Sequence, residues 1–102
     1  MKKILLMCSA GMSTSIMVKK MKEAAVSHKE EVQINAIAEQ ALEEHIAGTD
    51  IILLGPQVRF LQDKVQAEAK NVPVRVIDMM DYGTMNGAKI LQFALDVIDG
   101  KK

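Results

Sequence analysis

The sequence is poor in cysteine, in aromatic residues and in net charge, and each shortage excludes a class of protein. The 102 residues contain one cysteine, so no disulfide can form within the chain. One cysteine and two histidines are too few for the usual four-ligand zinc site. Thirteen basic residues balance thirteen acidic ones, whereas a general nucleic-acid binder relies on a basic surface. Aromatic residues make up 3% of the chain and tryptophan is absent, which argues against a stacking surface for single-stranded bases.

Long hydrophobic runs are also missing. No run approaches the ~18 apolar residues that a membrane-spanning helix needs, so we expect no insertion into a membrane. The apolar run at residues 4–7 follows two lysines but is too short for the core of a signal peptide, and it predicts a strand instead. A lone thiol is typical of a reducing compartment, so we expect a cytoplasmic protein.

What the sequence does contain is a regular alternation of two kinds of segment. Its length and its 49% hydrophobic content predict one globular domain over residues 1–102. Continuous apolar runs at 4–7 and 51–54, with more polar segments at 32–36 and 74–77, predict strands. Apolar residues recur at helical spacing within residues 13–28, 39–47, 58–69 and 88–98. The predicted order is therefore strand–helix, repeated four times.

This order predicts an α/β fold with a parallel sheet between two layers of helices. The first and third strands are apolar throughout, so they should be central, and the other two should lie at the edges. With right-handed crossovers the strand order is then 2-1-3-4, a three-layer flavodoxin-like arrangement. In such folds the ligand site lies beyond the carboxyl ends of the strands where the winding reverses. Cys8 stands at that point, because it ends the first predicted strand.

The residues after Cys8 suit the binding of an anion. They are small, hydroxyl-bearing or glycine, and they lead into a helix, whose free N–H groups and dipole favour a phosphate. The same surroundings stabilise a thiolate. We name this stretch the cradle segment; it consists of Ser9, Ala10, Gly11, Met12, Ser13, Thr14 and Ser15.

Several interpretations of Cys8 remain open at this stage. Buried cysteines are often inert, and serines before a helix often only cap it. A cysteine phosphatase needs an arginine six residues after the cysteine to grip the phosphoryl oxygens, and Thr14 occupies that position. A phosphoryl carrier, which holds the group without activating water, fits a cradle of backbone donors and hydroxyls. A module that binds an anion without covalent chemistry is the non-enzymatic alternative.

Three segments also resemble a known family. Residues 3–15, Leu54-Gly55-Pro56-Gln57-Val58 and Asp81-Tyr82-Gly83-Thr84-Met85-Asn86-Gly87 are similar to the enzyme IIB component of the bacterial sugar phosphotransferase system, of the lactose/cellobiose (chitobiose) type. The cysteine segment is the specific part. Length and element order agree with the family, so the resemblance covers essentially the whole chain.

The resemblance implies a concrete function. Cys8 would accept a phosphoryl group from a phosphohistidine of enzyme IIA, and the cradle segment would wrap that group. The phosphocysteine would then pass it to a sugar held by the membrane transporter, enzyme IIC, during uptake. A β-linked disaccharide such as cellobiose, chitobiose or lactose is the expected sugar. The fold would also resemble low-molecular-weight tyrosine phosphatases, so a phosphatase or an arsenate-reductase-like enzyme is the alternative. We expect a monomer without metal or cofactor.

Other residues at the carboxyl edge are candidates for accessory roles. Gln57 could approach the phosphoryl group, although a proline just before it also fits a plain helix start. Asp78 and Asp81 stand where a phosphatase could keep its general acid, but the favoured interpretation is that they cap a helix or stabilise a turn. Tyr82 could contact a partner or the loop after Cys8, or its hydroxyl could simply be packed. Methionines in the edge loops suit a surface that adapts to two partners; they are Met12, Met79, Met80 and Met85.

Overall fold

The computed structural model describes residues 2–7, 11–38 and 41–100, and the side chains of residues 11–14 are outside this description. Most of the expected elements are present, with a 3₁₀ segment and a short helix added. In chain order they are β1 (Lys2–Met7), α1 (Gly11–Ser27), β2 (Val32–Ile37), α2 (Leu42–His45), β3 (Ile51–Leu54), the 3₁₀ segment η2 (Pro56–Leu61), α3 (Gln62–Ala69), β4 (Val74–Val76), α4 (Met79–Gly83) and α5 (Gly87–Ile98).

The strands form a parallel sheet of order β2-β1-β3-β4, which confirms the predicted topology. β1 pairs with β2 on one side, Ile4 opposite Ile34, and with β3 on the other, Ile4 opposite Ile51. Residues 4–7 of β1 and all of β3 are buried. The unbroken apolar runs therefore mark the central strands because both of their faces are covered.

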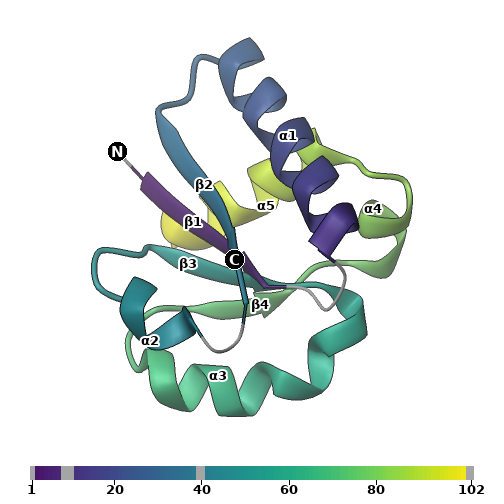
Figure 1. Cartoon of the computed structure of the whole chain (residues 1–102). Helices are drawn as coiled ribbons and strands as arrows, with labels where there is room; N and C mark the ends of the chain where they lie inside the picture. The colour runs from purple at the N-terminus through teal and green to yellow at the C-terminus, as the bar shows by residue number, and fades with distance from the viewer. Residues whose placement is uncertain (1, 8–10, 39–40, 101–102) are drawn as a thin grey trace.

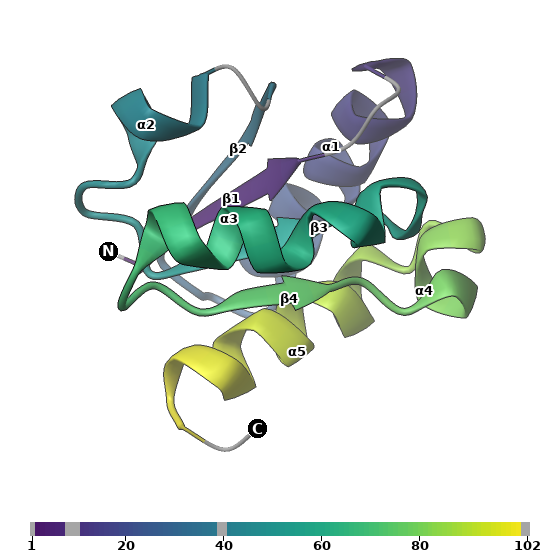
Figure 2. The same ribbon diagram turned by 90° about the horizontal axis from the view of Figure 1, so that it is seen from below.

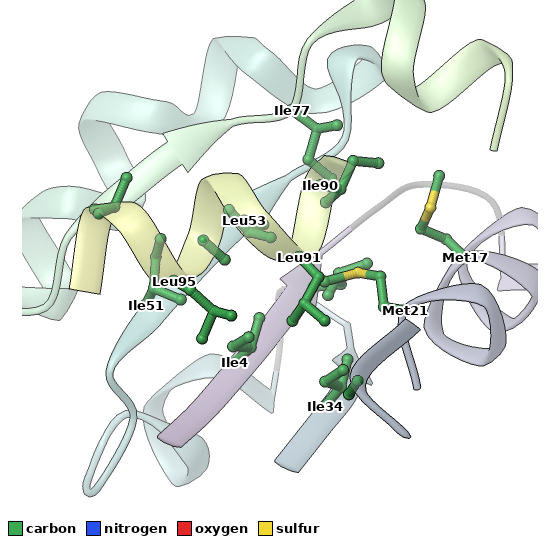
Figure 3. Close-up of a cluster of buried hydrophobic side chains, with 14 of the residues drawn as sticks. Ile4, Met17, Met21, Ile34, Ile51, Leu53, Ile77, Ile90, Leu91 and Leu95 are labelled. Carbon is green, nitrogen blue, oxygen red and sulfur yellow. The ribbon is translucent and has the colours of Figure 1, made fainter. Parts of the chain in front are cut away.

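Helices cover the sheet in two separate layers (Figure 1). Successive β1 side chains point to opposite faces, so that Ile4 and Leu6 enter one core and Leu5 and Met7 the other. Figure 3 shows the first core, in which Met17 and Met21 of α1 meet aliphatic side chains of α5 and the sheet. The second core lies beneath α2, η2 and α3.

A glycine sets the distance between the two helices of the first layer. A Cβ atom built on Gly87, the first residue of α5, would lie 2.6 Å from the carbonyl carbon of Lys20 and 2.7 Å from the amide nitrogen of Met21 in α1. Real Cβ atoms essentially never approach so closely. The absence of a side chain at Gly87 therefore allows α1 and α5 to pack together as they do.

The structure departs from the sequence prediction in its short elements. The segment expected as one helix over 58–69 is the 3₁₀ segment η2 followed by α3, with non-helical backbone at Val58. Of the helix expected over 39–47, residues 39 and 40 lie outside the described residues, and the α-helix α2 spans Leu42–His45. α4 was not expected; it begins because the Asp78 carboxylate accepts hydrogen bonds from the amides of Met80 and Asp81.

The two ends of the described chain meet at the amino edge of the sheet. The Nζ atom of Lys2, at the start of β1, lies 3.1 Å from Oδ1 of Asp99, just after α5. The amide of Lys3 donates to the Asp50 carboxylate at 2.8 Å, which joins the starts of β1 and β3. This edge is opposite the one at which β1 runs into Cys8.

Candidate functional site

The strand that leads to Cys8 is fixed by both of its neighbours. Met7 stands opposite Ile37 of β2 and Leu54 of β3. The amide of Gly55 donates to the carbonyl of Met7 at 2.9 Å, so the chain that leaves β3 is tied to the residue just before Cys8. Cys8, Ser9 and Ala10 themselves lie outside the described residues.

α1 begins at Gly11, three residues after Cys8. The backbone of the cradle segment is therefore helical from Gly11 to Ser15, which belong to the first turns of α1. The first four N–H groups of a helix have no partner within it and carry the positive end of the helix dipole. The side chains of Met12, Ser13 and Thr14 lie outside the described residues, and Ser15 is exposed. The predicted cradle thus includes a helix N-terminus close in sequence to the thiol.

η2 carries residues from the end of β3 across the carboxyl edge. Pro56 stands at the start of η2, where its fixed φ suits a helical turn. Gln57 is exposed two residues after Gly55. Arg59 and Phe60 follow and are exposed as well. The non-helical backbone at Val58 lets that residue enter the second core while its neighbours face solvent.

α4 carries residues from the end of β4 to the same edge. The Asp78 carboxylate caps α4 at 3.0 Å from the amide of Met80 and 3.2 Å from that of Asp81. Tyr82 is buried and belongs to the first core, which agrees with a packing role for its ring. Figure 2 shows α4, the turn before α3 and the start of α1 at the end toward which β1 and β4 point.

An open groove of about 700 Å³ lies between η2 and α4. Its lining brings together two of the predicted accessory residues, Gln57 and Tyr82, from segments far apart in the sequence. The lining residues are Pro56, Gln57, Arg59, Phe60, Met79, Tyr82 and Gly83. We call this feature the η2–α4 groove.

Asp81 is not among the residues that line this groove. Its side chain is 15% exposed and its Oδ1 atom lies 3.4 Å from Nζ of Lys89 in α5. It lines a second hollow, of about 560 Å³, together with Asp78, Lys89 and Asp96. Asp81 therefore links α4 to α5.

Sequence reasoning did not single out Arg59 and Phe60. Val58 and Leu61 have the spacing of the buried face of a helix, and that pattern predicted a helix without assigning a role to Phe60 between them. Both Arg59 and Phe60 follow soon after the end of β3, and the chain that leaves a parallel strand lies at the carboxyl edge of the sheet. This closeness in sequence is the signal that could have identified them as edge residues.

Within the part of the chain that the structure describes, no three His, Cys, Asp or Glu side chains are arranged to hold a metal ion. None of the described helices is long and apolar enough to span a bilayer.

Comparison with known proteins identifies the family. The model of the family described as the lactose/cellobiose-specific IIB subunit of the PTS matches residues 3–93. The chain belongs to this family of phosphotransferase-system IIB subunits. As a family member it is a sugar-specific EIIB component of the lactose/cellobiose type. EIIB components are phosphotransferases that work together with IIA and IIC components.

Curated relatives match over nearly their full length. The chain is 48% identical over 100 residues to the oligo-beta-mannoside-specific EIIB component of Bacillus subtilis, covering 96% of this chain and 97% of the relative. It is 42% identical over 105 residues to the cellobiose-specific EIIB component of Lactococcus lactis subsp. lactis, with the same coverage. A galactose-specific EIIB component of L. lactis subsp. cremoris matches with the same identity.

Solved IIB structures share the fold. The cellobiose-specific IIB protein of Borrelia burgdorferi superposes with a TM-score of 0.82 at 41% identity, covering 99% of this chain and 94% of that one. The lactose-specific IIB domain of Streptococcus pneumoniae superposes with a TM-score of 0.82 at 24% identity, covering 93% and 95%. At that lower identity the likeness concerns the fold alone.

Proposed function

We propose that Cys8 carries a phosphoryl group between enzyme IIA and a sugar held by enzyme IIC. The observation that carries the proposal is the position of Cys8. It is the sole cysteine, and it directly follows a strand whose last residue, Met7, is held by both neighbouring strands and by the amide of Gly55. A nucleophile so placed, three residues before a helix N-terminus, has backbone donors available for a phosphoryl dianion.

The transfer takes place in two steps. In the first, the Cys8 thiolate attacks the phosphorus of a phosphohistidine on enzyme IIA; the S–P bond forms, the P–N bond breaks, and its electron pair returns to the imidazole. In the second, a hydroxyl oxygen of the sugar attacks the same phosphorus. The S–P bond then breaks, the thiolate is regenerated, and the hydroxyl proton passes to a base on the transporter side.

The function of the cradle segment is to hold the phosphoryl group between these steps. The backbone N–H groups at the start of α1 lower the energy of the dianion without requiring a cation. Thr14, at the position where a phosphatase keeps arginine, leaves the cradle without a guanidinium to activate hydrolysis. We propose Gln57 and Tyr82, which line the adjoining groove, as accessory contacts. Asp81, which is paired with Lys89, supports α4.

Intact-protein mass spectrometry tests the carrier assignment. After incubation with a lactose/cellobiose-type enzyme IIA phosphorylated on histidine, the protein is expected to gain one phosphate, localised to Cys8. The Cys8→Ser variant should gain none. Phosphate on His28 or His45 instead would refute the assignment. Steady hydrolysis of a small aryl phosphate by the wild-type protein would favour the phosphatase alternative.

For the sugar we propose a β-linked disaccharide, such as cellobiose, chitobiose or lactose. The names of the relatives do not agree on one sugar, since two relatives that are each 42% identical to this chain are called galactose-specific and cellobiose-specific. Membrane vesicles that contain the partner enzyme IIC, supplied with Cys8-phosphorylated protein and a panel of sugars, test this directly. Phosphorylation of a monosaccharide in preference to every disaccharide would contradict the proposal.

A further inference from the structure

Exposed apolar side chains gather at the η2–α4 groove. Five large hydrophobic side chains are exposed among the described residues, and three of them stand in η2 or α4: Phe60 at 76%, Met79 at 65% and Met80 at 76%. Phe60 and Met79 line the groove. An aromatic ring and flexible thioethers around a concavity are the composition of a protein-binding surface.

The groove adjoins the place where Cys8 must act. Its η2 wall begins at Pro56, next to the Gly55 amide that donates to the Met7 carbonyl. Both walls follow strands at the carboxyl edge, η2 after β3 and α4 after β4. Figures 1 and 2 agree in placing η2, α4 and the start of α1 at this end. A protein that reaches Cys8 can therefore cover the groove in the same encounter.

The charge in the groove favours an acidic occupant. Arg59 is exposed, and among the described residues of the lining it is the charged one and there is no carboxylate. Among the described residues no carboxylate forms an ion pair with it. A guanidinium offers a planar fork of donors that matches a carboxylate with two parallel hydrogen bonds.

We compare three occupants of the groove by the charge that each would bring close to Arg59. The cytoplasmic loops of a membrane transporter carry an excess of lysine and arginine, which Arg59 would repel. A second copy of this chain, docked through the same patch, would bring Arg59 close to its own symmetry mate. A phosphoryl-donor protein that presents an acidic and apolar surface beside its phosphohistidine meets neither objection.

We propose that the η2–α4 groove is the docking surface for the phosphoryl donor. The donor places an apolar side chain against Phe60 and Met79 and a carboxylate on Arg59. Arg59 and Phe60 then select the donor, while Cys8 and the cradle segment perform the chemistry. This inference rests on the proposed function, because it takes enzyme IIA as the donor.

The test compares groove variants with matched variants elsewhere. Phe60→Ala and Arg59→Gln alter the groove; Val26→Ala, which removes an equally exposed side chain near the end of α1, and Lys22→Gln, on the same helix, are the controls. For each protein we would measure the Kd for unphosphorylated enzyme IIA and the KM for phosphorylated enzyme IIA. The rate of Cys8 alkylation by iodoacetamide reports separately on the thiol.

Phe60→Ala is expected to raise both constants about fivefold or more, as truncation of a central interface residue does. Arg59→Gln is expected to raise them several-fold at low salt and to flatten their dependence on salt. Arg59→Glu should reverse that dependence, so that added salt improves binding by screening the new repulsion. The control variants should bind like the wild type, and alkylation rates should be equal throughout.

Other results would overturn the inference while leaving the carrier function intact. One is unchanged Kd and KM in the groove variants of a protein whose Cys8 is phosphorylated normally. Normal phosphorylation with a selective loss of transfer to the sugar would assign the groove to the transporter instead. A wild-type dimer in sedimentation that Phe60→Ala dissociates would assign it to a second copy. Failure of the wild type to be phosphorylated on Cys8 would defeat the proposed function itself.

Discussion

At the scale of single residues, neighbours in the sequence serve different purposes. Asp81 and Tyr82 are adjacent in α4, yet Asp81 pairs with Lys89 whereas Tyr82 packs into the first core and lines the η2–α4 groove. Likewise, Val58 is buried while Arg59 and Phe60 are exposed. At this edge, the direction in which the local backbone points a side chain therefore decides whether that side chain packs in a core, forms an ion pair or faces solvent.

Asp78 offers a direct test at this scale. Asp78→Ala removes the acceptor for the amides of Met80 and Asp81 and should cost about 1 kcal/mol, as the loss of an N-cap usually does. Asp78→Asn keeps an acceptor oxygen and should lose much less. Urea unfolding measures both, and hydrogen exchange of the α4 amides locates the effect. Equal losses in the two variants would show that the carboxylate does not act as a cap.

Residue types in the sequence predicted part of the candidate site. The position of Cys8 after a buried strand followed from one apolar run and the helix after it. Gln57 and Tyr82 share the groove because the chain after each parallel strand emerges at one edge. The place of Phe60 in the groove was not predicted, because the segment 58–69 is not one regular helix but completes a 3₁₀ segment, with non-helical backbone at Val58, before α3 begins.

At the scale of elements, long apolar patterns predicted more than short ones. β1 and β3 were recognisable because strands buried on both faces consist of apolar residues throughout. α4 has five residues and depends on the Asp78 cap and its contact with α5. Helices of this length are not stable alone, so local sequence carries little signal for them. The end of α2 at His45 and the 3₁₀ form of η2 differ from the prediction for the same reason.

The packing of α1 against α5 gives a prediction at this scale. Gly87→Ala would place a methyl group 2.6 Å from backbone of Lys20, which cannot move aside as a side-chain end can. We expect a loss of about 1–3 kcal/mol in the free energy of unfolding, typical of overpacking.

Gly83→Ala is the matched control for Gly87→Ala. A Cβ atom on Gly83 meets nothing within 4 Å, so this change should be neutral or slightly stabilising. Thermal and urea unfolding of both variants provide the measurement. If Gly87→Ala were as stable as the wild type, the close approach of the two helices would not limit their packing.

At the scale of the whole molecule, the sheet separates two cores. Ile51 belongs to the core beneath α1 and α5, and its neighbour Ile52 belongs to the core beneath α2 and α3. Side chains on opposite faces of a strand share no packing partners across the sheet. A substitution that removes a buried methyl group from one core should therefore leave the packing of the other core unchanged.

Double-variant cycles test this separation. Ile51→Val and Ile52→Val should each cost about 0.5–1.5 kcal/mol, and their combination should equal the sum within about 0.5 kcal/mol. Ile4→Val is the matched comparison, because Ile4 stands opposite Ile51 in the same core and should couple with it. Strong coupling between Ile51 and Ile52 in urea unfolding would contradict the idea of two independent cores.

The ion pair between Lys2 and Asp99 also has a practical consequence. It joins the start of β1 to the residue just after α5, on the side of the sheet opposite the carboxyl edge. A tag, a fluorescent protein or a further domain joined near either of these residues would start from the edge opposite the one at which we propose phosphoryl transfer. The architecture thus lends itself to covalent tethering, in which the proposed carrier is linked to its donor or its transporter while the carboxyl edge of the sheet stays accessible.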